Sequence, residues 1–257
     1  LFGLVFFFEW GYRPSLEEVI LIYYTTLALG ALSLIGLFTN FSLAIFTLGC
    51  LFLQAFKYSF GDMHHPEALM MFALIVLTLS PSGKVYSLDS TLWRGRDVPQ
   101  GHARLEWNGQ FAGWAIKLLM GVYVLMYISA VFAKLSKGGL DWPNGFTLQY
   151  VMARDGLRNG NFLAIWLSQF HDFLRLSQYT VLVFQATFAL AVIFPMLRWI
   201  YIPLGLFFHS LNWLALGAPF PQWIALYAVF IPWSQVFMTV QARFWRKSKR
   251  SQQVASR

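Results

Sequence analysis

The segment Tyr127–Gly145 reads YISAVFAKLSKGGLDWPNG and joins a long apolar run to a short glycine-rich connection. Lys134 follows sixteen uncharged residues of this run. On a helix, Tyr123, Tyr127 and Lys134 share one face, because their separations match the 3.6-residue repeat. From Trp114 to Lys134 such a helix measures about 30 Å, the thickness of the hydrocarbon core of a bilayer. We therefore predict a membrane-spanning helix with a lysine at one boundary.

The composition extends this prediction to the whole chain. Of 257 residues, 58% are hydrophobic, 19% are aromatic and only 12% are charged, whereas soluble domains carry about 25% charge. Such a chain is typical of a polytopic membrane protein. Its one cysteine, Cys50, lies in an apolar run and allows no internal disulfide. We expect this side chain to be a packing residue.

Seven apolar segments of the sequence predict an all-α helical bundle. They are roughly Leu16–Phe38, Phe41–Tyr58, Pro66–Leu79, Phe111–Lys134, Tyr179–Met196, Trp199–Leu216 and Trp223–Val240. The N-terminal run LFGLVFFFEW is interpreted as the end of a further helix whose start is missing. We predict irregular structure for Lys84–Asn108 and for Leu135–Gln178, where FLAIWLSQF would be re-entrant or interfacial. The prediction is one transmembrane domain over 1–242 with about seven to eight spans.

The basic residues give the bundle an orientation. Six of the last fifteen residues are Lys or Arg, and they form a basic tail over 243–257. Basic residues favour the cytoplasmic side, which places the tail and the Lys84–Asn108 stretch inside and Lys134 outside. Arg154, Arg158 and Arg175 would then lie outside, against this bias. Because the net charge of +8 is concentrated in a tail that follows an apolar helix, we do not expect nucleic-acid binding.

Lys134 has two interpretations on spacing alone. A lysine at the edge of the hydrocarbon can snorkel and keep its ammonium in water. Alternatively, desolvation disfavours the ammonium and leaves a neutral amine that can act as a base.

The histidines are the other candidates for chemistry. His209 lies about 15 Å along its segment from Trp199, near mid-bilayer, where an ionisable group is either functional or part of an interhelical hydrogen bond. His64 and His65 precede the third segment, on the same side as Lys134. Neither HExxH nor any Cys/His metal spacing accompanies them, so no metal is expected.

Four stretches in order resemble the transmembrane domain of vitamin K-dependent gamma-glutamyl carboxylases and their bacterial relatives, the HTTM family. They are GALSLIGLFTNFSLAIF from Gly30, SPSGKVYSLDS from Ser80, YISAVFAKLSKGGLDWPNGFTLQYV from Tyr127 and IPLGLFFHSLNWLALG from Ile202. The resemblance covers roughly Gly30 to Trp233. Its most specific part is the Tyr–x–x–Ala–x–x–x–Lys–Leu element followed by Trp–x–x–Gly.

The resemblance implies a function and a set of site residues. In the carboxylases, the lysine that matches Lys134 deprotonates a vitamin K hydroquinone, whose oxygenation then drives carboxylation of glutamate. His209 and either His64 or His65 match family histidines, and the quinone would lie against Tyr127 and Trp142. The bacterial relatives imply a bacterial inner membrane, and the basic residues place the C-terminus in the cytoplasm.

A second class of function is open at this point. The chain could be a non-catalytic accessory subunit of a larger respiratory or photosynthetic membrane complex, because its segments are apolar and aromatic. Its partners would then be other membrane subunits as well as the lipid bilayer. A transporter is less favoured, because the sequence has no internal repeat.

Overall fold

The computed structural model describes residues 13–61, 65–84, 87–92, 102–233, 235, 236 and 238, with only the backbone for 65, 66 and 102–112. These described residues form helices, and none of them lies in a strand. The predicted all-α fold is therefore confirmed for this part of the chain. The elements are α2 (Leu16–Ile35), α3 (Thr39–Tyr58), α4 (His65–Leu79), η1 (Ser82–Lys84), α5 (Leu88–Leu92), α6 (His102–Gly138), η2 (Gly139–Asp141), α7 (Phe146–Asn159), α8 (Phe162–Leu167), α9 (His171–Thr187), α10 (Leu190–Ile193), η3 (Pro195–Leu197), α11 (Arg198–Leu216), α12 (Pro221–Leu226) and η4 (Tyr227–Phe230).

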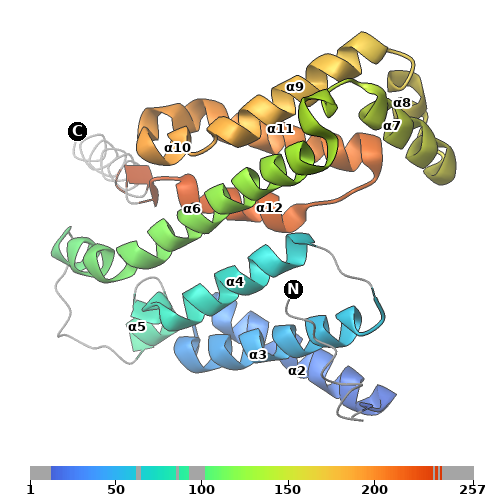
Figure 1. Cartoon of the computed structure of the whole chain (residues 1–257). Helices are drawn as coiled ribbons and strands as arrows, with labels where there is room; N and C mark the ends of the chain where they lie inside the picture. Colours follow the sequence, from blue (N-terminus) through green and yellow to red (C-terminus); the bar gives the residue numbers. More distant parts are fainter. Residues whose placement is uncertain are drawn as a thin grey trace, which may run out of the picture.

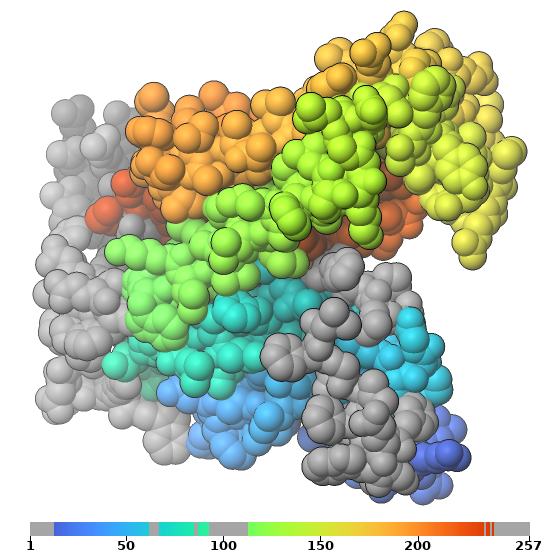
Figure 2. All heavy atoms as spheres, in the orientation of Figure 1, coloured from blue at the N-terminus to red at the C-terminus, as the bar shows by residue number. Residues whose placement is uncertain are grey.

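The helices form two groups that meet along α4 (Figure 1). Helices α2 to α5 make one group, and α6 to α12 make the other. Helix α4 packs against α3 on one side and against α6 and α12 on the other. The space-filling view shows the atoms of α4 and α6 in direct contact along this boundary (Figure 2). The larger hydrophobic core lies here, and it joins residues of α4, α6, α9, α12 and η4.

Within the described part of the chain, four stretches of helix are long and apolar enough to cross a membrane. They are Leu16–Ile35, Thr39–Tyr58, Gly113–Asp141 and Pro195–Leu216. These stretches correspond to the first, second, fourth and sixth predicted spans. The third predicted span is α4, an apolar helix of 15 residues, which reaches about 22 Å and is short for a bilayer.

The fifth and seventh predicted spans are not continuous helices among the described residues. Helix α9 ends at Thr187, and the short α10 ends at Ile193; the next residue, Phe194, has an extended backbone because Pro195 follows it. In the same way, η4 ends at Phe230, and Ile231 has an extended backbone before Pro232. The guanidinium of Arg198 donates to the carbonyls of Ala191 (3.0 Å) and Phe230 (3.4 Å). One arginine therefore supplies hydrogen bonds that both interrupted helices lack.

The prediction of irregular structure over Leu135–Gln178 is wrong. Helix α6 continues to Gly138, and η2, α7, α8 and the first half of α9 follow. The stretch FLAIWLSQF contains α8, whose first turn is capped by the Asn161 side chain, which accepts from the amide of Ala164 at 3.3 Å. Ala164 packs against Gly156 of α7, where an added Cβ would lie 3.1 Å away. Helix α7 is amphipathic, and the polar residues on one of its faces made this part of the sequence look like a loop.

The motifs GLFT and SLD lie against each other at the start of α3. The carboxylate of Asp89, in α5, accepts from the amides of Phe38 (2.8 Å) and Thr39 (2.6 Å) and from the Thr39 hydroxyl (2.8 Å). In return, the Asp89 amide donates to the carbonyl of Gly36 at 2.9 Å. Phe38 has a left-handed backbone, with φ of 47°. A carboxylate at a helix N-terminus satisfies free amides and complements the helix dipole.

We expect Asp89→Ala to destabilise the fold by about 1 to 3 kcal/mol, because it leaves two amides at the start of α3 without an acceptor. The free energy of unfolding in detergent micelles measures the effect. Thr91→Ala is the control, since the Thr91 hydroxyl donates only within its own short helix, to Leu88. Equal stability of the two variants would show that the Asp89 contacts contribute nothing.

Candidate functional site

One face of α6 carries the predicted tyrosines and lysine. Tyr123 and Tyr127 are each 1% exposed and lie in the larger core. Lys134, two turns after Tyr127, is partly buried. The spacing argument for this helix face is therefore confirmed for the tyrosines, and Lys134 continues the same inward line.

Lys134 is held by specific contacts. Its Nζ donates to the Ala130 carbonyl at 3.2 Å and to Gln185 Oε1 at 3.0 Å. The same nitrogen lies 5.5 Å from the centre of the Trp142 ring, within the range of a cation–π contact. Among the described residues, no carboxylate forms an ion pair with this amine. The geometry differs from that of a lysine that extends freely to water.

An apolar cavity of about 460 Å³ lies between α6, α7, α8, α9 and α11. We call it the Lys134 cavity, because Lys134 is the one charged side chain among the described residues that line it. The side chains on its wall that carry other polar groups are Trp142, Thr147, Ser177, Gln178 and Asn212. Such a cavity suits a ligand with an apolar body and one polar group that meets the amine.

His209 lies in the interior of the bundle and does not line the Lys134 cavity. It is 4% exposed, and its Nε2 lies 3.0 Å from the Tyr127 hydroxyl. Tyr127 also shares a hydrogen bond of 2.5 Å with the Tyr227 hydroxyl. His209 is absent from the wall of the Lys134 cavity, although Phe208 beside it is present. Tyr127, two turns before Lys134 on α6, therefore forms a hydrogen bond with the histidine that the resemblance gives as a site residue together with the lysine.

The surroundings of His209 are aromatic. Its ring lies 5.4 Å from that of Trp223 and 5.6 Å from that of Phe220, between centres. We call the interior group the aromatic cluster; its members are Tyr123, Tyr127, Phe184, Phe188, His209, Trp223, Tyr227 and Phe230. Within the described part of the chain, His209 Nδ1 and Trp223 Nε1 have no hydrogen-bond partner. The interhelical hydrogen bond considered for His209 is therefore present, through its other nitrogen.

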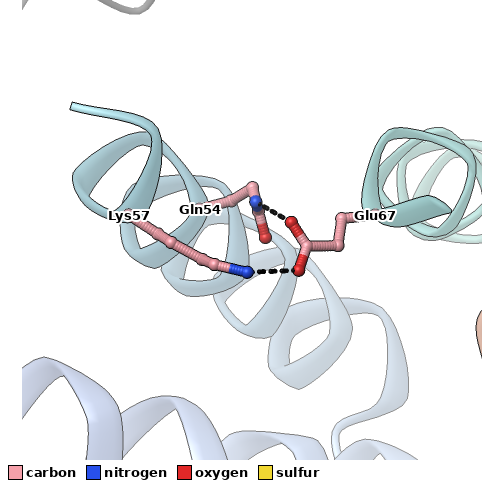
Figure 3. A network of polar contacts seen from close by, with 3 residues as sticks. All are labelled: Gln54, Lys57 and Glu67. Atoms are coloured by element: carbon pink, nitrogen blue, oxygen red, sulfur yellow. Dashed lines mark hydrogen bonds and ion pairs between the residues drawn. The ribbon is translucent and has the colours of Figure 1, made fainter. Parts of the chain in front are cut away.

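The predicted histidines before the third span cannot be placed as side chains. His64 lies outside the described residues, and of His65 only the backbone is described, as the first residue of α4. Two residues later, Glu67 accepts from Lys57 Nζ at 2.7 Å and from the amide nitrogen of Gln54. Figure 3 shows Glu67 reaching from α4 to both side chains of α3. These contacts fix the start of α4 against the end of α3.

The structure adds two residues that the sequence analysis did not single out as site residues. Gln178 and Gln185 are both buried on α9, and both contact the region of Lys134 and Trp142. Their signal in the sequence is a pair of amides seven residues apart, which two helical turns place on one face. The described residues contain no group of three His, Cys, Asp or Glu side chains that could hold a metal ion.

The two ends of the bundle carry different elements. Figure 1 shows α5 and α10 at one end, and α7 and α8 at the opposite end. On α7, Arg154 donates to Asp155 at 2.7 Å, and this hydrogen bond holds the pKa of the Asp155 carboxyl below its usual value.

Comparisons of the chain with protein-family models, with curated proteins and with solved structures give no match. The resemblance to the carboxylase transmembrane domain therefore rests on the quoted motifs and their order.

Proposed function

We propose that this chain is an integral membrane enzyme that binds a lipid-soluble hydroquinone in the Lys134 cavity. The lysine amine accepts the proton of a ring hydroxyl, as the first step of quinol-dependent carboxylase- or oxygenase-like chemistry. The observation that carries the proposal is an amine on the wall of an apolar cavity that no carboxylate of the described residues contacts. The motif resemblance around Lys134 supports the same ligand class.

The residues around Lys134 suit a proton acceptor. An aromatic hydroxyl and a lysine amine have similar pKa values, about 10 and 10.4, so a proton can move between them at small cost. Gln185 Oε1 orients Nζ, and the Trp142 ring stabilises the ammonium that forms. When bound, the hydroquinone supplies the acidic hydroxyl and the reducing equivalents for oxygen-dependent chemistry. The apolar wall keeps water from competing for the proton.

The proposal includes a place in the cell. We place the chain in a bacterial inner membrane, with α5 and Arg198 towards the cytoplasm and α7 and α8 towards the outside. This assignment follows from the basic residues, and it puts the C-terminus inside. The full bundle would have seven to eight spans, with α7 and α8 along the outer interface. The Lys134 cavity then opens on the outer half of the bilayer.

The test is binding of 2-methyl-1,4-naphthohydroquinone to the whole chain in mild detergent under anaerobic conditions. We expect Lys134→Met to weaken binding about tenfold or more, because the variant loses the hydrogen bond to the ligand. Lys137→Met is the matched control, since Lys137 is exposed and is not part of the cavity wall. Isothermal titration measures both affinities. Equal affinity of the two variants, or no binding by the unmodified chain, would contradict the proposal.

A non-catalytic accessory subunit is the alternative proposal, and the surface of α2 favours it. Thr26 is the one buried residue of this 20-residue helix, and its exposed surface includes the large apolar side chains of Leu16, Ile20, Leu21, Tyr23, Tyr24, Leu27, Leu34 and Ile35. Native mass spectrometry of the gently extracted protein separates the two proposals. A stoichiometric place in a large complex supports the accessory role, whereas an isolated chain with a retained quinone supports the enzyme.

A further inference from the structure

The connection between α6 and α7 carries Trp142 over Lys134. Helix α6 ends at Gly138, and Gly139 has a left-handed backbone, with φ of 59°. The connection reaches α7 through Gly145, with φ of 93°, a conformation that side chains disfavour. A Cβ at Gly145 would lie 2.8 Å from the His171 ring. Glycine backbones are flexible, so the two ends of the connection do not fix the position of Trp142. Its contacts with other residues must do so.

Gln178 of α9 holds this connection at two points. Its Oε1 accepts from the Gly145 amide at 2.6 Å, and its Nε2 donates to the Trp142 carbonyl at 3.2 Å. Gln178 is 2% exposed, so without it the Gly145 amide would be buried and unpaired. Bonds from one rigid amide to two residues three positions apart fix both the distance and the direction of the connection.

We propose that Gln178 is a positioning residue that fixes Trp142 as a wall of the Lys134 cavity and holds its ring over the lysine. The inference rests on the proposed function only in treating this cavity as the ligand site. Gln178, Trp142 and Lys134 all line the cavity. Gln185 forms its own hydrogen bond with Lys134, which a substitution of Gln178 leaves in place. Such a substitution therefore affects the Lys134 amine through the position of Trp142.

Gln149 provides a matched control in the same region. Its Nε2 donates to the Ser168 carbonyl at 2.8 Å, and its Oε1 lies 3.0 Å from His171 Nδ1. Like Gln178, it uses both ends of a partly or fully buried amide to tie two segments together. Unlike that of Gln178, the Gln149 side chain has no hydrogen bond to Trp142 or Gly145, and Gln149 is not part of the cavity wall. Its contact with Gly145 is a backbone hydrogen bond of α7 at 3.0 Å, which Gln149→Leu keeps.

The experiment measures how fast a lipid-soluble N-hydroxysuccinimide ester acylates Lys134 in the unmodified protein and in three variants. Peptide mass spectrometry on ligand-free protein gives each rate. We expect Gln178→Leu to raise the acylation rate about threefold or more, because the Trp142 ring no longer lies over the Lys134 amine. Trp142→Ala should raise it equally, and it keeps the test valid if Gln178→Leu does not fold. Gln149→Leu should leave the rate unchanged. An unchanged rate in Trp142→Ala, or in folded Gln178→Leu, overturns the inference.

Naphthohydroquinone affinity, measured on the same variants, separates this inference from the proposed function. A changed acylation rate without any hydroquinone binding keeps Gln178 as a positioning residue and overturns the quinol ligand. In the opposite outcome, hydroquinone binding depends on Lys134, but Gln178→Leu changes neither the affinity nor the acylation rate. That outcome supports the quinol ligand and overturns the role of Gln178.

Discussion

Gly205→Ala should destabilise the fold by about 3 kcal/mol or more, at the upper end of the range for an overpacked core. A Cβ on Gly205 would lie 1.9 Å from the Tyr227 hydroxyl oxygen and 2.3 Å from the ring carbon that bears it. Both distances are far below van der Waals contact, so either α11 or Tyr227 must move.

Tyr227 has no space into which it can move. Its ring is 2% exposed and lies 5.1 Å from the ring of Tyr123 and 6.0 Å from that of His209, between centres. Its hydroxyl shares the 2.5 Å hydrogen bond with Tyr127. Displacement of Tyr227 would break this bond and also disturb Tyr127, which lies beside His209. We therefore expect Gly205→Ala to affect the whole aromatic cluster.

The measurement is the free energy of unfolding in mixed detergent micelles. Gly121→Ala is the control, because Gly121 lies within α6 and a Cβ there meets no atom within 4 Å. That variant should gain about 0.5 to 1 kcal/mol from helix propensity. In a Tyr227→Ala background, Gly205→Ala should lose most of its effect. A large effect that persists without the tyrosine ring would disprove the steric explanation.

Phe188→Ala should cost about 3 to 5 kcal/mol, the range for removal of a buried phenylalanine. Phe188 is 0% exposed and joins the two tyrosines of α6 to the C-terminal elements. Its ring centre lies 4.8 Å from that of Tyr127, 5.5 Å from that of Tyr123 and 5.4 Å from that of Phe230. Lipid is as apolar as the core, so the loss comes from packing contacts rather than from transfer to water.

Unfolding in the same micelles tests this prediction, with Phe194→Ala as the control. Phe194 belongs to the same segment of the chain but is 54% exposed, so its removal should cost little. Phe188→Leu should recover about half of the loss, because it refills part of the cavity. If Phe188→Ala and Phe194→Ala are equally stable, the aromatic cluster is not the centre of the fold.

The sequence predicted those helices whose apolar segments are long and uninterrupted. Leu16–Ile35 and Thr39–Tyr58 could be located within a few residues, since a spanning helix needs about twenty apolar residues. The apolar composition of a segment does not show where a helix within it breaks. The run Tyr179–Met196 was therefore predicted to be one span. The break between α9 and α10 falls at Phe188 and Ala189, and no Gly or Pro marks it in the sequence.

The candidate site could be predicted on one helix but not between helices. Spacing along α6 placed Tyr127 and Lys134 on one face, and the motif pointed to Trp142. The partner of the lysine, Gln185, is 51 residues away, and no local pattern relates the two. For the same reason, the separation of His209 from the Lys134 cavity could not be foreseen, because the position of a residue along its helix does not say which residues of other helices it meets.

The apolar stretches of α4 and α6 differ in length, and we expect this difference to make the protein sensitive to bilayer thickness. The apolar stretch Gly113–Asp141, which α6 and η2 form, has 29 residues and measures about 43 Å, whereas α4 has 15 residues and measures about 22 Å. A thin membrane matches α4 and forces α6 to tilt or to protrude; a thick membrane does the opposite. Because the two helices share the larger core, we expect their crossing angle and the shape of the aromatic cluster to depend on the host lipid. Hydrophobic mismatch would then let membrane composition tune this protein.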